Sequence, residues 1–348
     1  DPSFFELVFL DCSSENIYRY GFEVTREKVI KEWLYYWNYL EFKKREKYIF
    51  IRNEQDFYIS RDFRKEISPR IGHSKDKALF VRNNSLLLSF LANINSKLAG
   101  AIVMCLNNID VSCSSNVFSK ELSNKYLNDK DGSKKINAFL KTADFGIDKA
   151  EILSENIDEE MPKKQLDSLF KGFSIILKSS KIIVPDEIIT YHKKYNSEGK
   201  VDGSVSFFLD KDESEGTKRY YNLAGYIIKC LEKGSVLIID EIDKSLHTLL
   251  TKYIIEMFNS KISNPNNGQL IFTAQDTNLL SDIFRRDQIW FIEKDRYGAS
   301  SLTSLLEYKV RKEDSFEKDY IKGRYGALPI ISILLENKLF DKEDESDE

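Results

Sequence analysis

Two carboxylates follow a short apolar stretch in the C-terminal half of the chain. Residues 235–243 read SVLIIDEID, in which Val236–Ile239 are apolar and Asp240 and Glu241 come next. An aliphatic run between Gly234 and a pair of acids is typical of a central strand in a parallel sheet. Adjacent like charges repel unless a cation shares their space, and Mg²⁺ favours carboxylates, water and phosphates. The pattern predicts a magnesium–phosphate site at the strand end, with an ordinary strand end before a turn as the alternative.

The expected chemistry is that of the Walker B element of a P-loop NTPase. In open α/β sheets, ligands sit beyond the carboxyl ends of the strands, where both acids lie if 236–239 form a strand. Asp240 is expected to hold Mg²⁺ through water, and Glu241 to orient and deprotonate the attacking water.

A possible anion site precedes this strand at the start of a predicted helix. Ser214, Glu215, Gly216 and Thr217 are followed by apolar residues at helical spacing. A serine hydroxyl, a glycine that permits close approach and free backbone N–H groups can bind an anion at a helix N-terminus. An ordinary N-cap is the alternative, because serine begins many helices. A polar helix start, the helix itself and then a strand that ends in two acids follow one another here. This is the order of the signature motif and Walker B in ABC-type ATPases. The apolar helix positions are Tyr220, Leu223, Ala224, Ile227, Ile228 and Leu231.

The residues after the acids continue this order. Ser245 and His247 stand where ABC-type ATPases carry a D-loop. A second buried strand is predicted at 270–273, in QLIFTAQDTNLL, and is followed by Gln275. We expect it beside 236–239 in parallel orientation, with Asp240 and Gln275 at the same edge of the sheet. Between the strands, a helix is predicted to bury Leu246, Leu249, Leu250, Tyr253, Ile254, Met257 and Phe258.

Composition narrows the class of protein. The chain has 348 residues, 42% of them hydrophobic, and a net charge of −4, so total charge gives no reason to expect nucleic acid, although a local basic patch stays possible. The four cysteines are scattered, which suits reduced thiols in a cytoplasm. Three histidines make a His-rich metal site improbable. There is no signal peptide and no apolar run near 20 residues, so we expect a cytoplasmic protein without a membrane anchor.

Four regions are predicted along the chain. Residues 1–77 indicate a β-rich lobe, and 78–202 indicate a mostly helical insertion with a Lys-, Asn- and Ser-rich stretch. Residues 203–335 alternate strand and helix, and 336–348 form an acidic tail. Within the lobe, Trp33, Tyr35, Trp37 and Tyr39 alternate onto one face of a strand. This stripe is interpreted as core or as an interface between layers, and a base-stacking surface is the alternative.

Several segments resemble one known family. ESEGTKR, LIIDEIDKSLH, LIFTAQDTNLL, RRDQIWFIEKD and DYIKGRYGALP resemble the AAA-type ATP/GTP phosphatases with ABC/SMC-like heads, which include AbiL- and RloA-type abortive-infection ATPases and the ATPase of PARIS-type systems. FFELVFLDCSSENIYRYGFEV is similar to the β-rich lobe that follows their P-loop. The resemblance implies an α/β fold with a mainly parallel central sheet, an N-terminal antiparallel lobe and a helical insertion.

The chain departs from this family at two points. It contains no GxxxxGK[ST], the loop that cradles phosphates. Since the family's loop lies upstream of the segment that resembles Asp1, we expect it to precede the printed residues. The family often has histidine after its FT strand, whereas this chain has Gln275. Glutamine can donate a hydrogen bond but carries no charge, so slow or differently arranged hydrolysis is expected.

The resemblance implies a mechanism shared between two heads. ATP and Mg²⁺ lie between the heads of a homodimer or higher oligomer, with Ser214, Gly216 and Thr217 of one subunit near the γ-phosphate held by the other. Ser245 and His247 connect the two sites, and closure controls an effector such as a TOPRIM-type nuclease or toxin in antiviral defence. The alternatives are a DNA-repair head of the SMC or RecF type, which the lack of sustained heptads disfavours, and a scaffold without catalysis. Binding of nucleic acid stays open.

Overall fold

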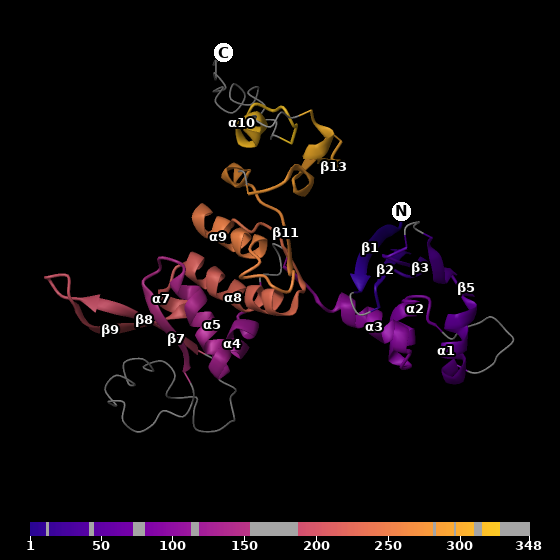
Figure 1. The fold of residues 1–348 in the computed structure, drawn as a ribbon, viewed down its shortest axis with the longest axis horizontal. Helices are drawn as coiled ribbons and strands as arrows, with labels where there is room; N and C mark the ends of the chain where they lie inside the picture. The colour runs from indigo at the N-terminus through magenta and orange to yellow at the C-terminus, as the bar shows by residue number, and fades with distance from the viewer. Residues whose placement is uncertain are drawn as a thin grey trace, which may run out of the picture. The chain divides into compact units, whose positions relative to one another are not determined.

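The computed structural model describes residues 1–11, 14–41, 45–71, 81–112, 118–153, 187–280, 283–295, 297–309 and 315–327. The chain divides into two compact units, Asp1–Asp110 and Val111–Glu348 (Figure 1). The predicted acidic tail, 336–348, lies outside the described residues. The predicted insertion, 78–202, contributes to both units.

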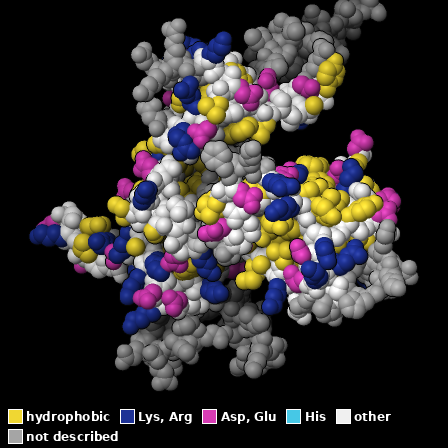
Figure 2. Space-filling model, turned by 45° about the vertical axis from the view of Figure 1, so that its right-hand side comes forward, with side chains coloured by type: hydrophobic (Ala, Val, Ile, Leu, Met, Phe, Trp, Pro, Cys, Tyr) yellow, Lys and Arg dark blue, Asp and Glu magenta, His cyan; other side chains and the backbone are white. Residues whose placement is uncertain are grey.

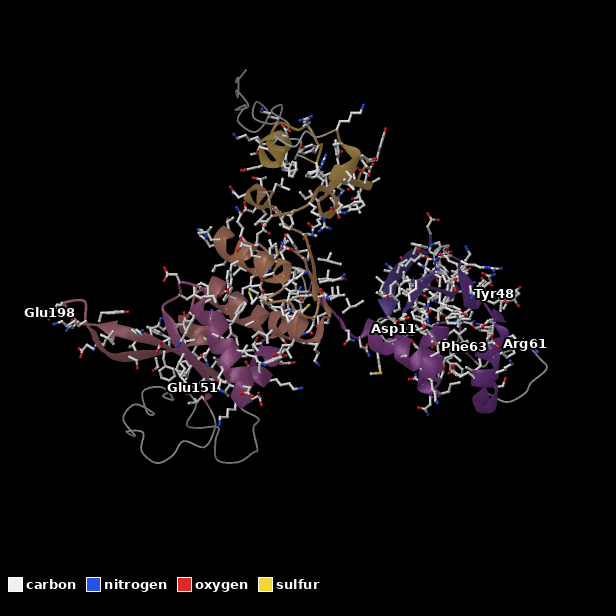
Figure 3. The ribbon with its side chains drawn as sticks, viewed as in Figure 1. Asp11, Tyr48, Arg61, Phe63, Glu151 and Glu198 are labelled. Carbon is white, nitrogen blue, oxygen red and sulfur yellow. The ribbon has the colours of Figure 1, made fainter. Side chains whose placement is uncertain are left out.

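The first unit is built on a five-stranded antiparallel sheet, which lies where the β-rich lobe was predicted. Its strands pair in chain order, β1-β2-β3-β4-β5. They are β1 (Ser3–Asp11), β2 (Asn16–Val24), β3 (Val29–Asn38), β4 (Lys47–Asn53) and β5 (Asp56–Ile59). Three helices complete the unit: α1 (Arg61–Ile71), α2 (Leu87–Asn93) and α3 (Lys97–Leu106). Side chains from the strands and these helices share one hydrophobic core, which includes Leu34, Phe50, Phe63, Leu91 and Ile102 (Phe63 is labelled in Figure 3).

A buried charge ties this sheet to α2. Glu32 of β3 is fully buried, and its carboxylate accepts hydrogen bonds from the N–H groups of Leu87 at 2.6 Å and Leu88 at 2.9 Å. Tyr20 donates its hydroxyl to the same carboxylate at 3.1 Å, and the buried Arg52 lies 3.8 Å away. Glu32 therefore caps α2 from outside that helix, where Leu86 supplies no side-chain cap.

The aromatic residues Trp33, Tyr35 and Trp37 of β3 alternate onto one face, as predicted, because β3 pairs with β2 without a shift through this stretch. Trp37 is buried, while Trp33 and Tyr35 stay half-buried. Trp33 and Tyr35 line a pocket of about 200 Å³ together with Arg19, whose guanidinium lies 4.5 Å from the Tyr35 ring centre. The exposed hydrophobic side chains of this unit include Phe4, Val8, Leu10, Tyr48 and Tyr58. Figure 2 shows hydrophobic side chains gathered at the surface of the molecule.

The second unit begins within β6 and mixes short sheets with helices. A three-stranded sheet has the order β11-β10-β6, and β10 and β11 are parallel. Its strands are β6 (Ile109–Ser112), β10 (Val236–Ile239) and β11 (Gln269–Phe272), and its longer helices are α4 (Glu121–Asn128), α5 (Lys130–Lys141), α8 (Glu215–Lys233) and α9 (Thr248–Asn259). The predicted parallel pair is confirmed. The prediction that the second strand is buried was wrong, because β11 lies at the edge of this sheet in the described residues and Ile271 is 54% exposed. In the described residues, the other sheets are antiparallel.

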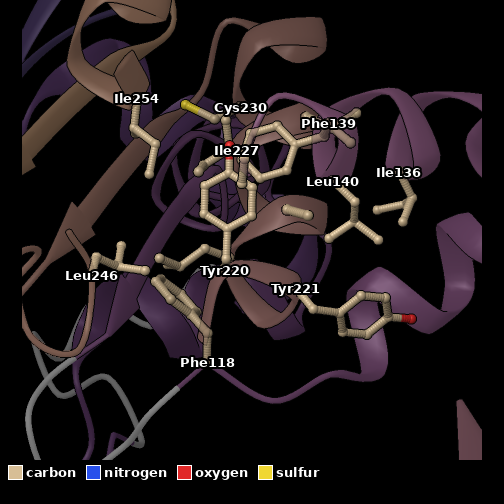
Figure 4. Close-up of a cluster of buried hydrophobic side chains, with 14 of the residues drawn as sticks. Phe118, Ile136, Phe139, Leu140, Tyr220, Tyr221, Ile227, Cys230, Leu246 and Ile254 are labelled. Atoms are coloured by element: carbon tan, nitrogen blue, oxygen red, sulfur yellow. The ribbon is translucent and has the colours of Figure 1, made fainter. Parts of the chain in front are cut away.

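Helix α8 is the centre of this unit's core. Its predicted apolar positions are buried, and the Tyr220 ring stacks on Phe139 of α5 with centroids 4.4 Å apart (Figure 4). Gly234 ends the helix in the left-handed region, at φ +65°, as a C-cap glycine does. A Cβ there would lie 2.2 Å from the carbonyl oxygen of Asn266, so the close approach of that loop also requires glycine.

Helix α9 buries a different stripe from the predicted one. Ile254 and Phe258 are buried as expected, but Leu249 is 68% exposed and Tyr253 is 37% exposed. The buried face instead includes Thr251 and Ile255. The prediction was wrong at Leu249 and Tyr253, because the helix begins only at Thr248 and its contact stripe is rotated relative to the one expected.

The segment 78–202 is less helical than predicted. It contains α2 to α5, but also β6, β7 (Ile147–Leu153), β8 (Glu187–Tyr195) and the start of β9 (Val201–Phe208). Strands β7, β8 and β9 form an antiparallel sheet, and Glu198 marks the turn of the β8–β9 hairpin (Figure 3). The alternate burial of Ile188 and Thr190 is the pattern of a strand, so a short period-2 signal was missed beside the leucine-rich helices.

The C-terminal part of the unit contains small elements. The short α7 (Leu209–Asp212) precedes α8, and η1 (Thr277–Leu279) and η2 (Arg286–Gln288) follow β11. A hairpin of β12 (Trp290–Lys294) and β13 (Ser300–Ser304) leads to η3 (Leu305–Glu307) and α10 (Phe316–Ile321). Arg285 binds Asp287 through two hydrogen bonds, and Arg324 binds Asp319 at 2.6 Å. Both arginines thus make ion pairs with acidic residues close by in the sequence.

No single helix in the described ranges is long and apolar enough to cross a membrane. Helices α2 and α3 pass that test only when counted together, and they are bent by 115° at the break between them.

Candidate functional site

The parallel strands β10 and β11 bring the predicted residues to one edge of the sheet. Ile239 and Phe272 are partners at the ends of the two strands, so Asp240 and Thr273 follow side by side. The Thr273 hydroxyl donates to Asp240 Oδ1 at 2.6 Å. The amide Nε2 of Gln275 donates to Glu241 Oε1 at 3.2 Å. The prediction that Asp240 and Gln275 share a sheet edge is therefore confirmed.

Glu241 has an unusual backbone conformation. Its φ is +52°, in the left-handed region that non-glycine residues seldom adopt. Its N–H donates to Thr273 Oγ1 at 2.8 Å, and its carbonyl accepts from Arg219 of α8. Its carboxylate also lies 3.4 Å from Lys244 Nζ, and 31% of the side chain is exposed. Such strain persists only where surrounding contacts hold it, and it occurs often at functional sites.

Asp243 is a residue that sequence reasoning missed. Its Oδ2 accepts the backbone N–H groups of Gln275 at 3.0 Å and Asp276 at 2.8 Å. Partial burial by itself raises the pKa of Asp276, but hydrogen bonds from Thr248 and Asn278 outweigh it and hold that pKa below its usual value. Asp243 thus fastens the turn after β11 to residues 240–246, here called the acidic turn. The signal available in the sequence was the third acid of DEID.

Removing the Asp243 carboxylate should loosen the turn that carries Gln275. Asp243→Ala leaves two N–H donors to water, and we expect a loss of about 1–3 kcal/mol of stability, typical of hydrogen bonds to a charged group. Asp243→Asn keeps one acceptor and should lose less. Hydrogen exchange at the amides of Gln275 and Asp276 measures the effect, and unchanged exchange in the alanine variant would show that Asp243 does not hold this turn.

The predicted helix start, residues 214–217, begins α8 with a side-chain cap. Ser214 is the N-cap, and its Oγ accepts the N–H of Thr217 at 3.1 Å and lies 2.9 Å from the Thr217 hydroxyl. Ser214 is exposed, whereas Thr217 is 2% exposed. A ligand that reaches this helix start from outside therefore meets Ser214, and Thr217 serves the cap. The nucleotide-binding role of both residues stays a prediction.

Gly216 lies against the acidic turn of the same subunit. A Cβ at Gly216 would come 2.7 Å from the carbonyl oxygen of Ser245, which is itself left-handed at φ +60°. Glycine is therefore needed at position 216 because it lets α8 approach the predicted D-loop. The sequence pattern did not indicate this packing role. His247 is exposed and is the N-cap of α9, where its Nδ1 accepts the N–H of Leu249 at 3.2 Å.

The oxygen-bearing side chains at this edge of the sheet suit a Mg²⁺ ion that binds together with phosphates. In the parts of the chain that the structure describes, no group of three or more His, Cys, Asp and Glu side chains could hold a metal ion alone. Proteins usually give Mg²⁺ one or two carboxylates and leave its other positions to water and phosphate. Asp240, oriented by Thr273, supplies such a carboxylate.

The comparisons with known proteins agree with this geometry. Residues 2–281 match the family model for an AAA domain of the AbiEii-toxin type, from type IV toxin–antitoxin (TA) systems. A search of curated proteins finds no match. Because the family model covers most of its length, the chain belongs to this AAA-domain family of the AbiEii-toxin type.

Proposed function

We propose that the protein is an ABC-type ATPase that binds and hydrolyses ATP between two heads and thereby switches a partner effector. The observation that carries the proposal is the meeting of Asp240, Glu241 and Gln275 at one edge of the β10–β11 pair. The phosphate loop is proposed to come from a segment outside the printed residues, since these contain no GxxxxGK[ST]. The family match supports an ATPase-like role.

The proposed chemistry assigns one task to each side chain. Asp240 holds Mg²⁺, which supplies charge neutralisation of the phosphates when bound. Glu241 orients the attacking water and takes its proton, because its carboxylate is aimed by Gln275 and by the fixed backbone of the acidic turn. Gln275 donates a neutral hydrogen bond, so it positions Glu241 without adding charge. Ser245 and His247 connect the two active sites across the dimer.

The biological setting rests on the sequence resemblance. It favours a cytoplasmic antiviral abortive-infection system in which head closure controls a nuclease or another toxin. Head closure and opening are the type of bistable change that nucleotide state can bias.

Ser214→Asp tests whether two heads meet at the helix start. Aspartate is as good an N-cap as serine, and the residue is exposed, so folding should be unchanged. A γ-phosphate from a second subunit would be repelled by the new charge, and ATP-dependent association should be lost. The measurement is light scattering or sedimentation with ATP and Mg²⁺, beside a thermal melt, on the loop-bearing protein, meaning this chain together with the segment that supplies the phosphate loop.

Ser315→Asp is the matched control, because Ser315 is the exposed N-cap of α10 and its Oγ accepts from Lys318 N–H. It should leave association unchanged. The 348 residues alone should bind ATP poorly. Normal association in Ser214→Asp would leave residues 214–217 as a helix cap only and favour the scaffold alternative.

A further inference from the structure

Arg219 links the helix start to the acidic turn within one subunit. It lies on α8, two residues after Thr217, and its Nη2 donates to the carbonyl of Glu241 at 2.5 Å. On the same helix, Gly216 lies against Ser245. Two separate points of α8 thus touch the acidic turn, one through a side chain and one through the backbone.

The Arg219 side chain is partly buried. Its Nε is buried and has no hydrogen-bond partner in the described part of the chain. Burial lowers the pKa of the guanidinium, and the charges of Glu241 and Asp243 oppose that effect. An apolar side chain would fill this space without leaving a buried donor unsatisfied. The group is instead held against Glu241, whose backbone is left-handed.

The contact from Arg219 acts on Glu241, the residue proposed to activate water. The left-handed backbone of Glu241 is held on its N–H side by Thr273 Oγ1 and on its carbonyl side by Arg219. The next N–H, of Ile242, donates to the carbonyl of Thr273 at 3.0 Å. The Glu241 carbonyl also accepts the N–H of Lys244 at 3.1 Å, so loss of Arg219 removes one of its two partners. The carbonyl side is then held less firmly, and the direction of the Glu241 carboxylate becomes less fixed.

We propose that Arg219 is a positioning residue that couples the helix start to Glu241. This inference rests on the proposed ATPase function. When the second subunit's phosphate meets Ser214, any shift of α8 is passed to Arg219, five residues further along the helix, and from there to the carbonyl of Glu241. The coupling makes water activation depend on closure of the two heads, so an open head does not hydrolyse ATP.

The test uses the loop-bearing protein with Arg219→Gln, Arg219→Lys, Glu241→Gln and the double variant Arg219→Gln/Glu241→Gln. We expect Arg219→Gln to lower kcat roughly 10- to 100-fold, as misplacement of a catalytic group does, with KM for ATP changed less than about threefold. Arg219→Lys should recover part of the loss. Since Arg219 acts through Glu241, the double variant should be no slower than Glu241→Gln. Lys218→Gln is the control, because Lys218 pairs with Glu215 at the surface of the same helix.

A second measurement needs no nucleotide. In the 348-residue chain, Arg219→Gln should speed hydrogen exchange in a peptide covering residues 240–246 and leave the middle of α8 unchanged. Unaltered exchange, unaltered kcat, or a further tenfold loss in the double variant would each overturn the inference. If the wild-type loop-bearing protein shows neither hydrolysis nor ATP-dependent association while exchange responds as expected, the proposed function fails and the Arg219–Glu241 contact stands.

Discussion

Glu241→Gln is expected to lower ATP hydrolysis by roughly 10²-fold or more in the loop-bearing protein, the size of effect seen when a general base is lost. Glutamine keeps the shape of the side chain and can still meet Gln275, but it cannot take a proton from water. ATP should therefore stay bound and the closed dimer should persist. The measurement is steady-state phosphate release, together with sedimentation in the presence of ATP.

Glu256→Gln is a suitable control for this variant. Glu256 lies on α9 and is exposed, and the same substitution there should leave both hydrolysis and association unchanged. Wild-type turnover in Glu241→Gln would exclude Glu241 as the base. Loss of ATP-dependent association in Glu241→Gln would contradict the expected persistent dimer, and would show that the carboxylate is needed for closure of the heads.

Glu32→Ala should destabilise the first unit by about 3–5 kcal/mol, as expected when one partner of a buried ion pair is removed. The substitution leaves Arg52 buried without its carboxylate, and it leaves the N–H groups of Leu87 and Leu88 and the Tyr20 hydroxyl without their acceptor. Glu32→Gln keeps an acceptor oxygen and should lose less.

Urea unfolding followed by tryptophan fluorescence measures this effect, because Trp33 and Trp37 lie in β3 beside Glu32. Glu54→Ala is the control, since the side chain of Glu54 makes an exposed pair with Lys28 and the substitution keeps its backbone hydrogen bonds. An unchanged unfolding midpoint in Glu32→Ala would mean that the sheet does not depend on this charge to hold α2.

The sequence by itself was sufficient for the elements with a strong local pattern. The run Val236–Ile239 predicts a buried strand, and the apolar spacing after Ser214 predicts a capped helix. Both are found, because hydrophobic period and capping chemistry are properties of neighbouring residues. The shared edge of Asp240 and Gln275 also followed, since the carboxyl ends of parallel strands lie together.

Only the tertiary structure decided which partners complete the site. Thr273 and Asp243 act on residues about thirty positions away, and Arg219 reaches Glu241 from another element. Gly216 looked like a place for an anion, but its missing side chain makes room for Ser245 of the same subunit. Local sequence patterns carry no information on such contacts, because they depend on how separate elements pack.

The same reason explains what was missed outside the site. Glu32 lies within an aromatic strand and gives no local sign that it caps a helix more than fifty residues later. The exposed Leu249 and Tyr253 have the apolar character of core residues, and only the rotation of α9 against its neighbours places them outside. The chain's own chemistry predicted the acidic strand end, whereas packing decided how Glu241 is held there.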